Sequence, residues 1–221
     1  IKTFCDQPYS AQSKIRIMPD VHAGKGCTIG TTLTVKDAVV PNVVGVDIGC
    51  GMLTVKLNEK RIDLPKLDSF IRQNIPCGRD VRERSHRSHG RLDVYELLCV
   101  KRVDIRRAKE SLGTLGGGNH FIEDDKDANG NIYIVVHSGS RHLGLEIANY
   151  YQEDAYKART SYKPEEIEAM ITSLKEAGRQ REIEATLKEM KSKVTNIPKS
   201  LAYVEGELFD QYIHDMKIAQ H

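Results

Sequence analysis

The sequence of 221 residues lacks tryptophan, has only seven prolines and contains no long apolar run. A membrane-spanning helix needs about 20 consecutive apolar residues, so the sequence predicts no membrane partner. Hydrophobic residues make up 39% of the chain and charged residues 29%, which excludes collagen-like, mucin-like and wholly disordered proteins. The length corresponds to one large or two small domains and is sufficient for a sizeable core.

The sequence also lacks a strong excess of charge of one sign, because its formal net charge is only +2. Binding to nucleic acid must therefore come from a local patch. Residues 79–109 contain ten Arg or Lys and five Asp or Glu, a local excess of five positive charges. This stretch is either a solvated helical face or a contact surface for a phosphate backbone.

The cysteines form no CxxC pair, and the N-terminus carries no signal-peptide pattern. Their number is odd and their spacing wide: Cys5, Cys27, Cys50, Cys77 and Cys99. These features predict a reduced, cytoplasmic protein. The chain starts at Ile1 rather than Met and stops at His221 inside a predicted helix, so we expect a fragment or a processed chain.

The pattern of apolar residues predicts strands first and helices later, which favours an α+β fold over regular βαβ units. We expect strands at 28–35, 52–57 and 132–136, and buried strands or tight connections at 39–40 and 43–48. We expect helices at 62–74, 143–156 and 201–220, a helical hairpin at 164–195 and a polar turn at 124–131. The chain is interpreted as a single domain, 1–221, that contains this hairpin.

Four short stretches carry residues suited to chemistry: 18–26, 46–52, 116–120 and 137–141. Asp47 and Cys50 are three residues apart in a glycine-rich bend that can turn both side chains toward one ion. His120 follows three glycines, and His137 ends an apolar strand, where ligands are commonly presented. Ligand softness favours Zn²⁺, with Mn²⁺, Fe²⁺ or Co²⁺ as alternatives. A buried structural cysteine and satisfied core histidines remain the alternative interpretation.

The glycines at 116–118, followed by Asn119, offer several backbone N–H groups to an anion. Ser138, Ser140 and Arg141 add two hydroxyls and a guanidinium, which is suited to bidentate phosphate recognition. A set of tight turns without a ligand is the alternative.

Together these stretches resemble the RtcB-type RNA ligases, the GTP- and manganese-dependent tRNA-splicing ligases. The matching signatures are MPDVHAGKG (18–26), VGVDIGCGM (44–52), LGGGNHFIE (115–123) and VVHSGSR (135–141), and EGELFDQYIHDMKIAQ (205–220) is similar to the family's helical segment. The resemblance implies an α+β RtcB-like fold that is incomplete at the C-terminus.

The resemblance implies a cytoplasmic enzyme that joins RNA 2′,3′-cyclic phosphate or 3′-phosphate ends to 5′-hydroxyl ends. Such enzymes act through a histidine–GMP and an RNA-3′-GMP intermediate, in tRNA splicing or RNA repair. The implied cofactors are GTP and two Mn²⁺ ions, with Zn²⁺ as an alternative metal. The implied partners are tRNA halves or broken RNA ends, together with an activating protein.

The resemblance also implies roles for individual residues. The implied metal ligands are Asp47, Cys50, His120 and His137, with Cys50 also counted as catalytic because its thiolate binds the ion. The implied guanylate contacts are Asn119, His120 and Glu123. Asp20 would orient the guanylylated histidine, and His22 belongs to the same motif. The implied phosphate contacts are Ser138, Ser140 and Arg141.

The sequence departs from the family pattern in one respect. It contains no match to the later motifs that hold a further metal-binding histidine, the guanylylated histidine and a guanine-contacting lysine. Two alternatives therefore stay open: a metal-dependent phosphoesterase acting on RNA ends, or a non-catalytic RNA-binding fragment.

Overall fold

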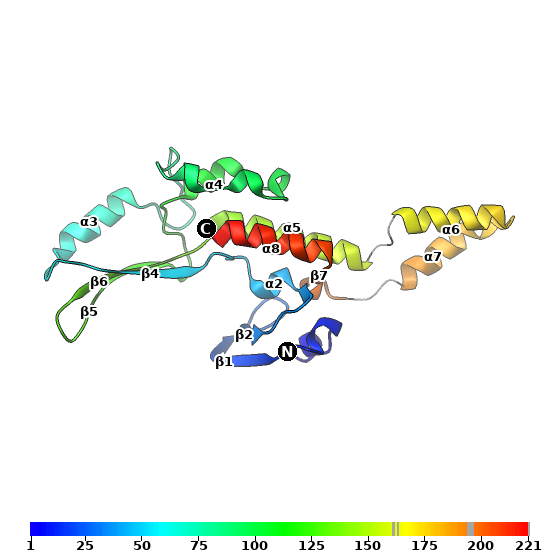
Figure 1. The fold of residues 1–221 in the computed structure, drawn as a ribbon, viewed down its shortest axis with the longest axis horizontal. Coiled ribbons are helices and arrows are strands. Elements are labelled where there is room, and N and C mark those ends of the chain that lie inside the picture. Colours follow the sequence, from blue (N-terminus) through cyan, green and yellow to red (C-terminus); the bar gives the residue numbers. More distant parts are fainter. Residues whose placement is uncertain (161, 163, 194–196, 221) are drawn as a thin grey trace. The chain divides into compact units, whose positions relative to one another are not determined.

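The computed structural model describes residues 1–160, 162, 164–193 and 197–220. Its helices and antiparallel strands confirm the expected α+β class (Figure 1). The strands are β1 (Ile15–His22), β2 (Ile29–Leu33), β3 (Ala38–Val39), β4 (Gly51–Lys56), β5 (Phe121–Lys126), β6 (Ile132–Ser138) and β7 (Val204–Glu205). The α-helices are α1 (Lys2–Cys5), α2 (Pro41–Val44), α3 (Leu64–Asn74), α4 (Ile105–Ser111), α5 (Arg141–Thr160), α6 (Pro164–Glu176), α7 (Ile183–Lys193) and α8 (Glu207–Gln220). None of the helices described is both long and apolar enough to cross a membrane.

The chain divides into two compact units. The first comprises Ile1–Val44 and Asn149–Asp210 and contains the antiparallel pairs β1–β2 and β3–β7. Gln152, which is 5% exposed, holds this unit together: its amide nitrogen donates to the Lys199 and Ala202 carbonyls at 2.7 and 2.9 Å, and its oxygen accepts from the Asn42 N–H at 2.9 Å. The amide thereby satisfies backbone groups that burial would otherwise leave unpaired.

The range expected to form a helical hairpin holds α6 and α7. α6 ends in a turn in which Gly178 adopts a φ of +71°, a conformation that favours glycine after a helix. Ile167, Met170 and Leu174 are half-buried along one side of α6, as the helical spacing predicts. Val194 and Thr195 lie outside the described residues.

The second unit comprises Gly45–Ala148 and Gln211–His221 and contains the three-stranded antiparallel sheet β4–β6–β5. β6 is the central strand (Figure 1). The register pairs His137 of β6 with Met52 of β4 and with Phe121 of β5. The sheet therefore brings the start of β4, the start of β5 and the end of β6 together at one end of the sheet.

Several expectations about the elements were wrong. The polar turn expected at 124–131 covers only the residues after Lys126, because Asp124–Lys126 pair with β6 and the Asp127 carboxylate closes the turn on the N–H groups of Asn129 and Asn131. The helix expected at 201–220 begins at Glu207, since the preceding residues form a 3₁₀ turn and β7. The sequence reasoning also missed strand β1.

The other differences concern the connections. Of the run 43–48, the first two residues belong to α2 rather than to a strand. Residues 79–104 contain short 3₁₀ turns and no α-helix, so a continuous helical face is absent from this part of the basic segment.

Candidate metal centre

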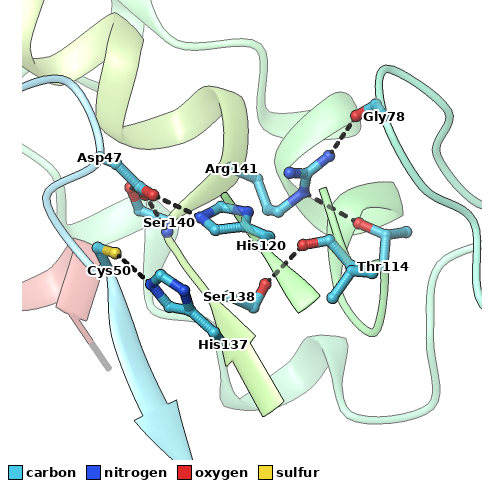
Figure 2. Close-up of polar contacts among 10 residues, drawn as sticks. Asp47, Cys50, Gly78, Thr114, His120, His137, Ser138, Ser140 and Arg141 are labelled. Atoms are coloured by element: carbon cyan, nitrogen blue, oxygen red, sulfur yellow. Dashed lines mark hydrogen bonds and ion pairs between the residues drawn. The ribbon is translucent and has the colours of Figure 1, made fainter. Parts of the chain in front are cut away.

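Cys50, His120 and His137 converge at one end of the sheet in the second unit. One ligand atom from each lies within 4.8 Å of the others. The Cys50 Sγ is 3.0 Å from the His137 Nε2, and the two imidazole rings have centroids 5.3 Å apart (Figure 2). A thiol and two imidazoles form a donor set suited to a divalent transition metal.

The strand register explains why residues so distant in sequence meet. Cys50 lies two residues before Met52, which pairs with His137. His120 directly precedes Phe121, which pairs with His137 from the other side. The turn before β4 and the glycine-rich loop before β5 therefore end beside the same residue of β6, as Figure 2 shows.

Asp47 is bound to this cluster through His120. Its Oδ2 accepts a hydrogen bond from the His120 Nε2 at 2.8 Å, and its Oδ1 accepts from the backbone N–H and the hydroxyl of Ser140 at 2.9 and 3.2 Å. Gly139 makes this arrangement possible, since a Cβ there would overlap the Asp47 carboxylate. Carboxylate support of this kind fixes the orientation and tautomer of a ligating imidazole.

The hydrogen bond to Asp47 leaves the other ring nitrogen of His120 free. Because a carboxylate only accepts, Nε2 carries the proton and neutral His120 has its lone pair on Nδ1. This Nδ1 is buried and has no hydrogen-bond partner among the described residues, and the side chain is only 7% exposed. This nitrogen faces the Arg141 guanidinium, because a Cβ on Gly116 would overlap both the His120 Nδ1 and the Arg141 Nη1. A cation held together with Asp47 and Cys50 would therefore use the His120 Nε2, which lies 2.8 Å from the Asp47 Oδ2. The carboxylate, thiol and imidazole donors gathered here fit a metal ion.

Metal binding at Cys50 depends on the loss of its thiol proton. Loss of some solvation around the sulfur raises the pKa of the Cys50 thiol, and the neighbouring Asp47 carboxylate raises it further. The thiolate, rather than the thiol, is the metal ligand, so a cation has to displace the thiol proton. Cys50 is exposed and the His120 Nδ1 unpaired, which argues against the alternative of a buried structural cysteine with satisfied histidines.

The residues expected to hold phosphate lie beside the cluster, where their polar groups are partly engaged. Ser138 donates its hydroxyl to the Leu115 carbonyl at 2.8 Å, and Ser140 donates to Asp47. Arg141 donates from Nε to the Thr114 hydroxyl at 3.1 Å and from Nη2 to the Gly78 carbonyl at 2.9 Å (Figure 2).

Two further features mark Arg141. Its φ of +57° is strained for a residue with a side chain, and such strain is concentrated at functional sites. Partial burial lowers the pKa of its guanidinium, and this effect outweighs the neighbouring Asp47 carboxylate, which raises it. Arg141, together with Ser138 and Ser140, lines a cavity of about 220 Å³.

The other expected site residues are not part of this cluster. Asn119 and Glu123 are exposed, in the loop before β5 and within β5. Asp20 and His22 lie in β1 of the first unit, where the His22 Nδ1 donates to the Asp20 carbonyl at 2.7 Å.

Sequence reasoning missed two residues that shape the site, Gly139 and Thr114. Gly139 had a signal, because a glycine between two candidate phosphate-binding serines indicates close packing. Thr114 had none, since only the fold brings its hydroxyl to Arg141.

Comparison with known proteins gives a consistent result. A sequence profile of the family described as tRNA-splicing ligase RtcB matches residues 7–98 and 79–221. The RNA-splicing ligase RtcB of Escherichia coli (strain K12) is 37% identical over 163 residues, which cover 65% of this chain and 40% of the relative. The tRNA-splicing ligases RtcB of Thermococcus kodakarensis and Nanoarchaeum equitans are 29% and 28% identical, over 66% and 61% of this chain and 41% and 39% of their own lengths. The chain thus spans about 40% of the length of these relatives, and it belongs to the RtcB family.

Proposed function

We propose that this chain is the metal-binding part of an RNA ligase that joins 2′,3′-cyclic phosphate or 3′-phosphate ends to 5′-hydroxyl ends. The family match and the names of the relatives support RNA ligation. The observation that carries the proposal is the convergence of Cys50, His120 and His137 at one end of the sheet. The proposed route uses GTP through a histidine–GMP and an RNA-3′-GMP intermediate, for which the 221 residues contain no acceptor motif.

In this proposal Cys50, His120, His137 and Asp47 hold Mn²⁺, with Zn²⁺ as the alternative. A bound divalent cation neutralises charge that develops on phosphoryl oxygens. The Asp47 Oδ2 and the His120 Nε2 lie 2.8 Å apart, so both can become ligands of one cation once the proton between them is lost. Ser140 fixes Asp47 from the opposite side through its backbone N–H and its hydroxyl. The Cys50 thiol loses its proton when it becomes a ligand.

The RNA end is proposed to lie beside this centre. Nε and Nη2 of Arg141 are held by Thr114 and Gly78, which leaves Nη1 to donate to a phosphate oxygen. Ser138 and Ser140 line the same cavity and add hydroxyl groups to its wall. Asn119 and Glu123 are proposed to contact the guanylate, and Asp20 to orient the guanylylated histidine.

The proposed setting is a cytoplasmic one, with tRNA halves or broken RNA as substrate and an activating protein as partner. All five cysteines are free thiols, which is consistent with a reducing compartment.

Metal titration of the purified chain is the first test. We expect Mn²⁺ or Co²⁺ to bind stoichiometrically to the wild type, and Cys50→Ala and His137→Ala to weaken that binding by at least about tenfold. Cys77→Ala is the matched control, because Cys77 is also an exposed cysteine of the second unit but lies outside the cluster. Equal metal affinity in all four proteins would refute the proposed site.

RNA chemistry is the second test. The chain is incubated with Mn²⁺, labelled GTP, an RNA 3′-phosphate end and an RNA 5′-hydroxyl end. We expect no labelled protein adduct from the 221 residues, because the acceptor motif is missing from them. A longer protein that contains the chain should join the ends and lose that activity when it carries Cys50→Ala. Retention of joining by this variant would contradict the proposal.

A metal-dependent phosphoesterase is the second candidate. It is favoured by the fact that the cluster is assembled within one compact unit without the guanylylation motif. Opening of a 2′,3′-cyclic phosphate by the chain with Mn²⁺, Zn²⁺ or Co²⁺ and no GTP would support it. RNA binding without opening in all three metals would leave a non-catalytic binding role.

A further inference from the structure

A loop in the second unit concentrates positive charge without any acidic residue. We call residues 84–91, RSHRSHGR, the arginine–histidine loop. The side chains of Arg84, Arg87 and Arg91 are exposed and make no hydrogen bond or ion pair with the rest of the described chain. The loop therefore presents three guanidinium groups whose donors are available to a ligand.

Three other arginines of the basic segment, Arg82, Arg106 and Arg107, are engaged in hydrogen bonds. Arg82 donates to the Leu112 and Gly113 carbonyls at 3.0 and 2.6 Å, and Arg106 pairs with Glu110 at 2.8 Å. These arginines stabilise the fold through their hydrogen bonds and ion pairs, whereas Arg84, Arg87 and Arg91 do not. Arg79, Lys101 and Arg102 are also exposed cations without such a partner, but within segment 79–109 only the arginine–histidine loop holds three of them in eight residues with no acidic residue.

The loop is ordered by its own histidines. The His86 Nδ1 accepts from the Ser88 N–H at 3.2 Å, and the His86 carbonyl accepts from both the N–H and the Nδ1 of His89, each at 2.9 Å. Both ends of the loop are anchored, because Arg82 binds the 112–113 turn at one end and Val94 is fully buried at the other. An ordered loop loses less conformational entropy when it binds a ligand.

Packed residues connect the loop to the candidate site. Arg82, at the foot of the loop, holds the Gly113 carbonyl, and the next residue, Thr114, accepts from the Arg141 Nε. The cavity beside the metal centre is lined on one side by residues 138–141 and on the other by residues 111–114 and by Leu92, the residue that follows the loop. Arg141 and the foot of the loop thus belong to one packed region of the second unit.

We propose that the arginine–histidine loop binds backbone phosphates of a single-stranded RNA whose 3′ end lies at the candidate metal centre. This inference rests on the proposed function. Guanidinium groups bind phosphates through paired hydrogen bonds, and three of them spread over eight residues suit successive phosphates of one strand. Their removal is expected to change the salt dependence of RNA binding, since each phosphate contact releases counterions.

Fluorescence anisotropy tests this surface with a labelled single-stranded RNA of about 12 nucleotides that ends in a 3′-phosphate. The wild type is compared with the combined variant Arg84→Gln, Arg87→Gln, Arg91→Gln. The control variant carries the same loss of charge at exposed positions of α6, the following turn and α7: Lys175→Gln, Arg181→Gln, Lys188→Gln. Thermal melting of all three proteins checks that the folds are equally stable.

The loop variant should bind the RNA more weakly and with a shallower salt dependence. At about 0.7 logarithmic units for each phosphate contacted by a single strand, three lost contacts lower the slope by about 2. Between about 50 and about 200 mM salt, the wild type should therefore lose roughly 20-fold more affinity than the loop variant. The control variant should keep the wild-type slope.

The outcomes separate this inference from the proposed function. Equal RNA binding by the wild type and the loop variant would overturn the inference and leave the proposed function standing. Absence of RNA binding by the wild type would overturn both. Inorganic triphosphate is the second probe: if the loop variant lost affinity for triphosphate and kept it for RNA, the loop would bind a nucleotide and the inference would be overturned.

Discussion

Replacing Gly139 with alanine is expected to weaken metal binding while the fold persists. A Cβ at this position would overlap the Cγ and both oxygens of the Asp47 carboxylate, well inside the 3.0 Å that real Cβ atoms keep from their neighbours. Gly139 does not have a positive φ, so alanine adds no backbone strain there. The substitution thus acts first on Asp47, which must move by on the order of 1 Å.

The expected loss follows from what Asp47 holds. Its displacement breaks the 2.8 Å hydrogen bond from His120 and the bonds from Ser140, so the His120 ring loses its fixed orientation. Removing such support from a metal-ligating histidine typically lowers metal affinity by about 10- to 100-fold, or about 1.4 to 2.7 kcal/mol. Isothermal titration calorimetry with Mn²⁺ or Co²⁺ measures this loss directly.

Gly51→Ala is the matched control for this experiment. Gly51 starts β4 directly after Cys50, and a Cβ there would have the Gly49 carbonyl oxygen as its nearest neighbour at 3.9 Å, an ordinary contact. This variant should keep the wild-type metal affinity. If Gly139→Ala also kept it, the position of Asp47 would be irrelevant to the site and the reasoning would be refuted.

Two further predictions concern stability and pH. Asp215 is fully buried and accepts from the N–H groups of Leu98 and Cys99 at 2.9 and 3.0 Å. Asp215→Ala should therefore lower the free energy of unfolding by roughly 2 to 4 kcal/mol, measured by urea denaturation. A loss below about 1 kcal/mol would contradict the assigned role. Hydrogen bonds, chiefly those from Asn131, lower the pKa of Asp127 to about 2. Because this pKa is depressed, the contribution of Asp127 to stability is complete above about pH 4 and is lost as the pH falls toward 2. The difference in melting temperature between the wild type and Asp127→Asn should therefore shrink over that pH range. A constant difference would contradict the assignment.

Local sequence patterns identified much of the fold. Alternating apolar residues placed β2 and β4 close to their observed bounds, a continuous apolar run placed β6, and helical spacing placed α3 and α5. These elements depend on preferences within a few residues of the chain. The exceptions show the limit of this reasoning: Asp124–Lys126 is polar, yet it is a strand because the neighbouring β6 supplies its hydrogen-bond partners.

The candidate site likewise combines features that can be read from the sequence with features that depend on the fold. The sequence by itself singled out the residues suited to binding a metal or a phosphate, because thiol, imidazole and carboxylate groups next to glycines are readable from residue types and spacing. Only the tertiary structure decided that Cys50 and His120 meet at His137, since the register of three antiparallel strands brings them there. It also decided which nitrogen of His120 is free, because the tautomer depends on groups that lie close in space and far apart in sequence.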